Sequence, residues 1–227
     1  MVDGVRIVED LHRWGVPILE LVLSESAAGR LGAWPPARSA GRCAVVADGV
    51  MEGLAPTRHP QGVLAVVPEP RRPAWRPGRG VTLLLEGVQD PGNVGAAIRS
   101  AAALGADAVL LTPGCADPYH PAAVRGAAGT VFRIPVHREV AAEAAVRAVR
   151  EAGGEARAAV AGGEDVRSWR PRLPVLLLLG AEGAGLAPET AAAAGGTVGI
   201  PLARDVESLN VAVAAAVLLW ELLRTRP

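Results

Sequence analysis

The chain has 227 residues, half of them hydrophobic, and its 23 basic and 23 acidic residues cancel. This composition excludes a largely disordered chain, and no apolar run reaches the roughly 18 residues of a membrane span. A neutral total gives no support for nucleic-acid binding, but it leaves room for a local basic face.

The basic residues are all arginine, which excludes any mechanism that needs a Schiff-base or phosphate-binding lysine. A skewed genomic base composition explains this bias as well as function does. Cys43 and Cys115 are isolated and lack metal-ligand spacing, so we expect neither a disulfide framework nor a metal site. Asp3 and Glu9 lie where a signal peptide needs basic and apolar residues, so we expect a soluble, cytoplasmic protein.

The first seventy residues predict a small α+β unit. The stretch "VRIVEDLHRWG" has apolar residues at helical spacing and ends at Gly15, a favourable residue after a helix. The other elements expected here are a strand at 17–23, a helix at 24–31, a strand leading into a helix at 42–50, and a strand at 61–67.

The stretch "PEPRRPAWRPGRG" (68–80) separates two parts of the chain. Proline removes backbone donors and fixes φ, so this stretch is neither a helix interior nor a central strand. We therefore expect a first domain at 1–70, a linker at 71–80 and a second domain at 81–227. The linker is either a plain spacer or a segment whose arginines contact RNA phosphates.

The second domain alternates strands and helices. The strands expected are 81–87, 107–112, 130–136, 155–161, 174–180 and 196–202. Runs such as "VLLLL" have no polar face, which is typical of strands that are buried on both sides. The pattern predicts an α/β fold with a parallel sheet covered by helices.

Three polar or glycine-rich clusters follow strands of this domain. They are "DPGN" (90–93) with Arg99 six residues later, "GAEGAG" (180–185), and "PLARDVESLN" (201–210) before an apolar helix. Ligands of open α/β sheets bind outside the carboxyl ends of the strands, which makes these clusters candidates.

Each cluster also has an ordinary structural explanation. Asn93 or Ser208 is a good helix N-cap, and Arg99 is equally a surface arginine paired with an acid. The glycine run lacks dinucleotide spacing and the P-loop lysine, so it does not define a nucleotide-binding motif by itself.

Taken together, the three motifs resemble a known family. "PGNVGAAIRSAAALGA", "LLLLGAEGAGL" and "IPLARDVESLNVAVAAAV" are similar, in order and spacing, to the motifs of the SpoU/TrmH ribose 2′-O-methyltransferases of the SPOUT class. The first eighty residues resemble, more loosely, the substrate-binding domain similar to ribosomal protein L30e that many members carry.

The resemblance implies a fold and a reaction. The expected fold is a parallel-sheet α/β SPOUT domain with a C-terminal trefoil knot, preceded by a small α+β L30e-like domain. The expected activity is transfer of a methyl group from S-adenosylmethionine to a ribose 2′-hydroxyl of RNA. Ribosomal RNA is favoured over tRNA because minimal tRNA-modifying members often lack the front domain. A homodimer is also implied. The alternative is a non-catalytic RNA-binding or ribosome-assembly protein.

The resemblance also assigns residues. The cofactor-binding residues are Gly180, Ile200 and Leu209, largely through their backbone; the catalytic set is Asn93, Arg99, Glu182, Ser208 and Asn210. Arg99 either deprotonates the ribose hydroxyl or stabilises the developing alkoxide, and a guanidinium is essentially always protonated. Glu182 orients Arg99 or a backbone amide.

RNA contacts are expected from arginines, which neutralise phosphates. The candidates are Arg125, Arg71 and Arg72, with Arg76 and Arg79 in the linker and Arg6, Arg13, Arg38, Arg42 and Arg58 before it. Arg125 and Gly129 fit the family pattern Arg-Ala-Ser-x-Gly, but Ala127 replaces its serine. If that hydroxyl contacts RNA or the knot, the contact is missing here.

Overall fold

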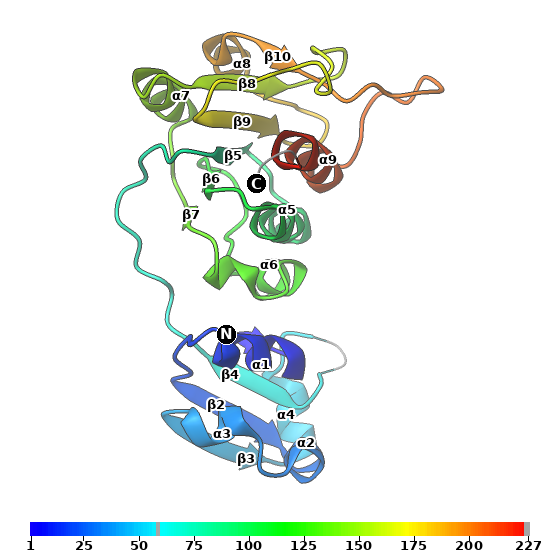
Figure 1. Ribbon diagram of the computed structural model, residues 1–227. Coiled ribbons are helices and arrows are strands. Elements are labelled where there is room, and N and C mark those ends of the chain that lie inside the picture. Colours follow the sequence, from blue (N-terminus) through cyan, green and yellow to red (C-terminus); the bar gives the residue numbers. More distant parts are fainter. Residues whose placement is uncertain (58–59, 225–227) are drawn as a thin grey trace.

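The first part of the chain forms a mixed four-stranded sheet with short helices (Figure 1). The computed structural model describes residues 1–57 and 60–224. The elements of this part are β1 (Val2–Asp3), α1 (Val5–Arg13), β2 (Glu20–Ser24), α2 (Glu25–Leu31), α3 (Pro35–Ser39), β3 (Arg42–Val46), α4 (Asp48–Leu54) and β4 (Val63–Val66). The strand order is β1-β4-β2-β3, with β2 and β3 parallel and β4 antiparallel to β1 and β2.

The helices and strands expected before the linker are all present, and the structure contains two further elements that were not predicted. Gly15, which follows the C-cap residue Trp14 of α1, has a φ of 72°. The Ser24 hydroxyl caps α2 by accepting a hydrogen bond from the N–H of Ala27. The two-residue strand β1 was not predicted because it is too short for an alternating pattern. The helix α3 was not predicted because it opens with Pro35 and Pro36, which suit only a first turn.

The second part of the chain is a six-stranded parallel sheet with helices on both faces, as predicted. Its elements are β5 (Val81–Glu86), α5 (Pro91–Leu104), β6 (Ala108–Leu111), α6 (Pro121–Gly126), the 3₁₀ helix η1 (Thr130–Phe132), β7 (Val136–His137), α7 (Ala142–Glu151), β8 (Glu155–Ala159), β9 (Val175–Gly180), α8 (Pro188–Ala194), β10 (Thr197–Val198) and α9 (Val211–Leu223). The order is β10-β8-β9-β5-β6-β7, and neighbouring strands are parallel.

Alternate residues of the central strands face opposite layers. Leu83 and Leu177 belong to the core that contains α5 and α9, whereas Leu84 and Leu178 belong to the core beneath α7. Figure 1 shows α5 and α9 on one side of the sheet and α7 and α8 on the other. The continuous apolar runs of β5 and β9 are therefore buried on both faces.

Two of the predicted strands are much shorter than expected. Residues 130–136 begin as the helix η1 because the Thr130 hydroxyl donates to the carbonyl of Ala127 at 2.7 Å, and only β7 joins the sheet. Residues 196–202 contain only β10, because Gly199 exchanges backbone hydrogen bonds with the loop at 164–166 and Pro201 follows. No helix in the described residues is long and apolar enough to cross a membrane.

Candidate active site and cofactor cavity

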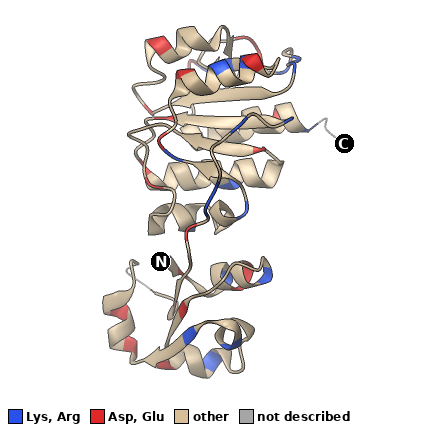
Figure 2. Ribbon diagram, turned by 90° about the vertical axis from the view of Figure 1, so that its left-hand side faces the viewer, with Lys and Arg blue, Asp and Glu red and all other residues tan. Residues whose placement is uncertain are grey.

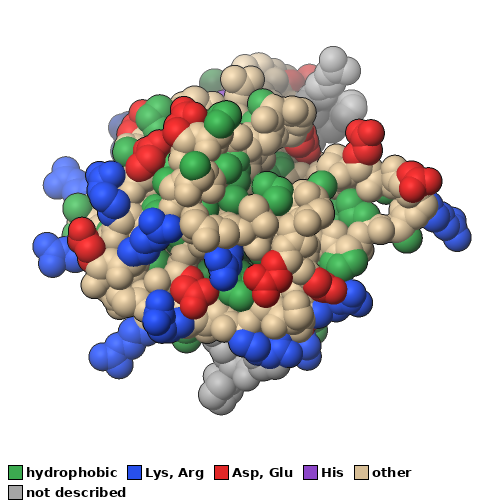
Figure 3. All heavy atoms as spheres, turned by 90° about the horizontal axis from the view of Figure 1, so that it is seen from above, with side chains coloured by type: hydrophobic (Ala, Val, Ile, Leu, Met, Phe, Trp, Pro, Cys, Tyr) green, Lys and Arg blue, Asp and Glu red, His purple; other side chains and the backbone are tan. Residues whose placement is uncertain are grey.

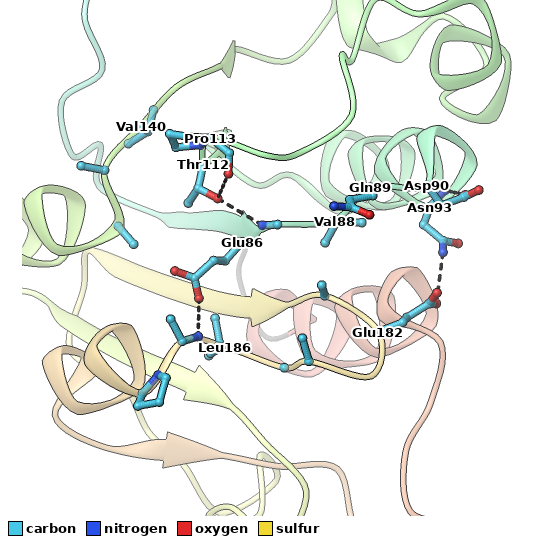
Figure 4. Close-up of a pocket in the computed structure, with 18 of the residues that line it drawn as sticks. Glu86, Val88, Gln89, Asp90, Asn93, Thr112, Pro113, Val140, Glu182 and Leu186 are labelled. Atoms are coloured by element: carbon cyan, nitrogen blue, oxygen red, sulfur yellow. Dashed lines mark hydrogen bonds between the residues drawn. The ribbon is translucent and has the colours of Figure 1, made fainter.

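Three segments that are distant in sequence meet at one hydrogen-bonded cluster. The Asn93 amide Nδ2 donates to Glu182 Oε1 at 3.1 Å (Figure 4). The Asn210 amide Nδ2 donates to Asn93 Oδ1 at 3.0 Å and to Glu182 Oε1 at 2.5 Å. We call Asn93, Glu182 and Asn210 the polar trio. Glu182 Oε1 also accepts a longer hydrogen bond, 3.4 Å, from the backbone N–H of Val211.

Local capping explains how the two asparagines are placed. The N-cap of α5 is Asp90, whose carboxylate accepts from the N–H of Asn93 at 2.7 Å, so the Asn93 side chain is free to reach other segments. The N-cap of α9 is Asn210, whose Oδ1 accepts from the N–H groups of Ala212 and Val213. Asn93 therefore does not cap α5 and Ser208 does not cap α9, so the ordinary structural explanation of these two residues is wrong.

The glycine loop after β9 places Glu182 at the tip of a tight turn. A Cβ at Gly180 would overlap the backbone of Gly185 and Leu186, so this position accepts only glycine without a shift of the chain. The turn closes through a 2.8 Å hydrogen bond from the N–H of Gly185 to the carbonyl of Ala181, and Gly185 has a φ of 70°.

Glu86 anchors the far end of this loop and was not predicted from the sequence. Its carboxylate accepts from the N–H of Ala187 at 2.8 Å and from the Thr190 hydroxyl at 2.6 Å. The available signal was an acid at the end of the apolar strand "VTLLLE". Figure 4 shows Glu86 pointing from β5 toward the loop that holds Leu186.

The predicted cofactor residues lie around one cavity of about 490 Å³. Gly180, Ile200 and Leu209 line it, together with the catalytic candidates Glu182 and Ser208. Its floor is apolar, from Val198, Val211, Ala214 and Leu218. The backbone N–H groups of Ile200 and Leu209 have no protein acceptor among the described residues, so they remain available to a ligand.

A second cavity of about 950 Å³ lies on the other side of the glycine loop (Figure 4). Asn93 from the first turn of α5 and Thr112 directly after β6 line it, and its lining contains no arginine. Both cavities share Ala181, Glu182, Gly185 and Leu186. The glycine loop is thus the wall between them.

Arg99 is not part of the polar trio within one chain. It lies six residues after Asn93 on α5, about 9 Å along the axis and roughly 120° around it. Its side chain is exposed and makes no hydrogen bond or ion pair with the described residues. Ser208 is exposed at the rim of the smaller cavity.

The arginine candidates for RNA binding are exposed where the structure describes them. Arg125 lies in the last turn of α6, and the adjacent Gly126 packs against Gly92, which brings this arginine's segment to the start of α5. Arg71 and Arg72 are exposed in the linker. Arg58 lies outside the described residues. Ala127 is fully buried, so a side chain at this position does not face bound RNA.

Within the described residues, no group of histidine, cysteine and acidic side chains is arranged to hold a metal ion.

These observations define a parallel α/β domain with a nucleoside-sized cavity at the carboxyl edge of its sheet, walled by a glycine loop and an asparagine-capped helix. The chain belongs to the SpoU rRNA Methylase family, whose family model matches residues 80–220.

Relatives and solved structures agree with this family. An uncharacterized tRNA/rRNA methyltransferase from Synechocystis is 33% identical over 79% of this chain and 66% of its own length. A 23S rRNA (guanosine(2553)-2'-O)-methyltransferase from Bacillus subtilis is 34% identical over 80% of this chain and 72% of its own length. The chain therefore matches only part of the length of these curated relatives.

A crystal structure of an AdoMet-bound rRNA methyltransferase from Sinorhizobium meliloti is 32% identical, with a TM-score of 0.82. The likeness covers 99% of this chain and 87% of that chain. It therefore extends over both sheets of the molecule.

Proposed function

We propose that this protein transfers a methyl group from S-adenosylmethionine to a ribose 2′-hydroxyl of RNA, with ribosomal RNA as the substrate. The observation that carries the proposal is the polar trio, whose Glu182 lines the 490 Å³ cavity. Family membership and the names of the B. subtilis and S. meliloti relatives support the reaction and the RNA class.

The smaller cavity fits the methyl donor. Its volume is in the range of small-molecule sites, and its apolar floor suits an adenine ring. The free N–H groups of Ile200 and Leu209 are donors for ring nitrogens. The missing side chain of Gly180 lets the backbone of Gly185 and Leu186 pack against it, which forms the wall of the cavity. When bound, S-adenosylmethionine would supply a methyl group on a sulfonium centre, from which a neutral thioether is an excellent leaving group.

The polar trio positions the ribose. Glu182 Oε1 already accepts three donors, which holds the carboxylate in place, whereas Oε2 has no donor among the described residues. We assign Oε2 to a hydroxyl or guanidinium that enters the site. Asn93 fixes this carboxylate from one side, and Ser208 offers a hydroxyl to the ribose or its phosphate. Fixed geometry of this kind lowers the entropic barrier to in-line attack.

Arg99 stabilises charge in this proposal. The hydroxyl loses its proton as its oxygen attacks the methyl carbon, and a protonated guanidinium is a donor, not a base. Arg99 therefore donates hydrogen bonds to the developing alkoxide, while the hydroxyl proton passes to an oxygen of the neighbouring RNA phosphate or to water.

A second copy of the chain would bring Arg99 to the trio. The outward face of α9 carries Val213, Val217 and Trp220, which are 49%, 39% and 58% exposed and lie one turn apart. The loop 201–209 extends from the body beside this helix (Figure 3). We propose a homodimer through this face, with an active site completed by both subunits, in the cytoplasm.

The same proposal includes the finer fold. We propose that 81–227 is the methyltransferase domain, with the segment after β10 threaded as the trefoil knot of the family. Residues 1–70 are then an L30e-like RNA-binding domain and 71–80 the linker. Arg125, Arg71 and Arg72 contact RNA phosphates. Exposure of these arginines and the mixed sheet of the first part support this division.

The test is incubation with labelled methyl donor and RNA. Purified protein, labelled S-adenosylmethionine and total RNA from a strain without the gene should yield label at a single 2′-O-methyl site. Label in tRNA instead would correct the substrate. Calorimetry of the protein with S-adenosylmethionine alone tests the alternative of a non-catalytic RNA-binding protein, since that alternative predicts no affinity for the methyl donor.

A further inference from the structure

The segment between the two sheets does not behave as a free spacer. We call residues 67–80 the strap. Near its end, the N–H of Gly80 donates to the Asp107 carboxylate at 2.5 Å. Trp75 is partly buried against the core cluster that contains Leu84 and Leu110. Figure 2 shows the strap running along the face of the second unit, with basic residues spaced along it. The second half of the strap is therefore docked.

The first half of the strap is held by Arg138, just after β7. Its guanidinium pairs with Glu69 of the strap and, through its other terminal nitrogen, with Asp117 at 3.2 Å. The same guanidinium carbon lies 5.4 Å from the ring centroid of Tyr119. Tyr119 lines one cavity together with Glu69 and Arg72 of the strap, which places the ring against it. Burial, together with the charge of Glu69, raises the pKa of Tyr119. One arginine thus contacts an acid of the strap, an acid of the loop after β6 and an aromatic ring.

The two units also touch directly. The Arg133 guanidinium carbon lies 5.6 Å from the ring of Trp14, and a Cβ at Gly129 would come 3.0 Å from Ile7. This seam and the Arg138 cluster hold the first unit at two separate places. With a single attachment the first unit could rotate relative to the second. Two separate attachments fix its orientation.

We propose that Arg138 is a positioning residue that clamps the strap through Glu69 and thereby sets the distance between the RNA-binding unit and the methyl-transfer site. This inference rests on the proposed function for its RNA readout. The clamp does not touch the cofactor cavity, because none of its residues lines that cavity. It should therefore affect the use of RNA and leave binding of the methyl donor unchanged.

The strap offers a direct readout because the chain has no lysine. In a chain without lysine, trypsin cleaves only after arginine, and it does not cleave an arginine–proline bond. The strap therefore has two cleavable bonds, Arg71–Arg72 and Arg79–Gly80. Loss of two partly exposed ion pairs should raise the local opening of the strap about fivefold. In Arg138→Ala we expect cleavage at Arg71–Arg72 to be about fivefold faster than in the wild type, and Arg147→Ala, another exposed arginine, to be unchanged.

Methyl transfer gives the second readout. With in vitro transcribed 23S rRNA and labelled S-adenosylmethionine, Arg138→Ala should raise the KM for RNA about fivefold, with kcat and the affinity for the methyl donor unchanged. Glu69→Gln should reproduce both changes, and the double variant should add little to either single one. Arg138→Lys should restore part of the loss, because one ammonium can pair with one carboxylate but cannot span both.

The outcomes separate the clamp from the proposed function. Unchanged cleavage and unchanged KM in Arg138→Ala overturn the clamp, and so do additive effects in the double variant. If the wild type methylates no RNA, the proposed function fails, while the cleavage rates of the two single variants still decide the clamp. If Arg138→Ala misfolds, the milder Glu69→Gln decides it in the same assays.

Discussion

Asn210 performs two tasks with different atoms, and substitution can separate them. Its Oδ1 caps α9, while its Nδ2 donates to Asn93 and Glu182. Asn210→Ala removes both, whereas Asn210→Ser retains a capping oxygen and loses the Nδ2 donor. The difference in stability between the two variants should therefore equal the contribution of the cap. Both variants should lose the hydrogen bonds of the polar trio to the same extent.

The magnitudes follow from the contacts. An N-cap contributes about 1 kcal/mol, and each of the two exposed Nδ2 hydrogen bonds about 0.5–1 kcal/mol. For a chain of this size, 1 kcal/mol lowers Tm by about 2–4 °C. Asn210→Ala should thus lower Tm by roughly 5–10 °C and Asn210→Ser by about half as much. Both should reduce kcat about 100-fold, because Glu182 is no longer held.

Calorimetric Tm values of the protein without cofactor, and single-turnover methyl transfer, measure these effects. Ser208→Ala is the matched control for stability, since Ser208 is adjacent but does not cap the helix. Equal Tm values for the Ala and Ser variants would contradict the cap. A Ser variant with wild-type Tm and transfer would contradict the role of the trio.

Four further results are expected. Gly180→Ala should abolish measurable binding of S-adenosylmethionine in calorimetry, because its Cβ overlaps the closing turn of the glycine loop; retained affinity would contradict this view of the wall. Arg99→Ala should bind the methyl donor normally and lose transfer about 100-fold in single-turnover assays, and wild-type transfer would remove its assigned role. Trp220→Glu should shift the protein from dimer to monomer in analytical ultracentrifugation, and an unchanged mass would place the dimer face elsewhere. Burial and the charge of Arg72 lower the pKa of His137, so the folded state resists protonation and stability falls as the pH drops below about 6.5; His137→Gln should show a smaller fall in Tm between pH 7.5 and 5.5, and an equal fall would contradict this assignment.

The layered parallel sheet was predictable because burial on two faces leaves a continuous apolar run in the sequence. "VTLLLE" and "VLLLLG" both show it, and both became central strands. The strands at 130–136 and 196–202 were predicted too long, because the competing interactions come from a threonine hydroxyl and from a distant loop at 164–166. Local pattern carries no information about such partners.

The candidate site was predictable residue by residue but not as a geometry. The motifs identified Asn93, Glu182 and Asn210, yet only the fold brings them within hydrogen-bonding distance of each other. The sequence also did not reveal which residue caps each helix. Asp90 and Asn93 are both good caps for α5, and Ser208 and Asn210 are both good caps for α9. The support given by Glu86 to the glycine loop depends on a contact across 101 residues, which no local pattern encodes.

The single turn from Ala181 to Gly185 is a partition with a ligand space on each side. Any displacement of that turn enlarges one compartment at the expense of the other. A ligand that displaces this turn from one cavity changes the free energy of binding in the other, and thermodynamic reciprocity makes that effect equal in both directions.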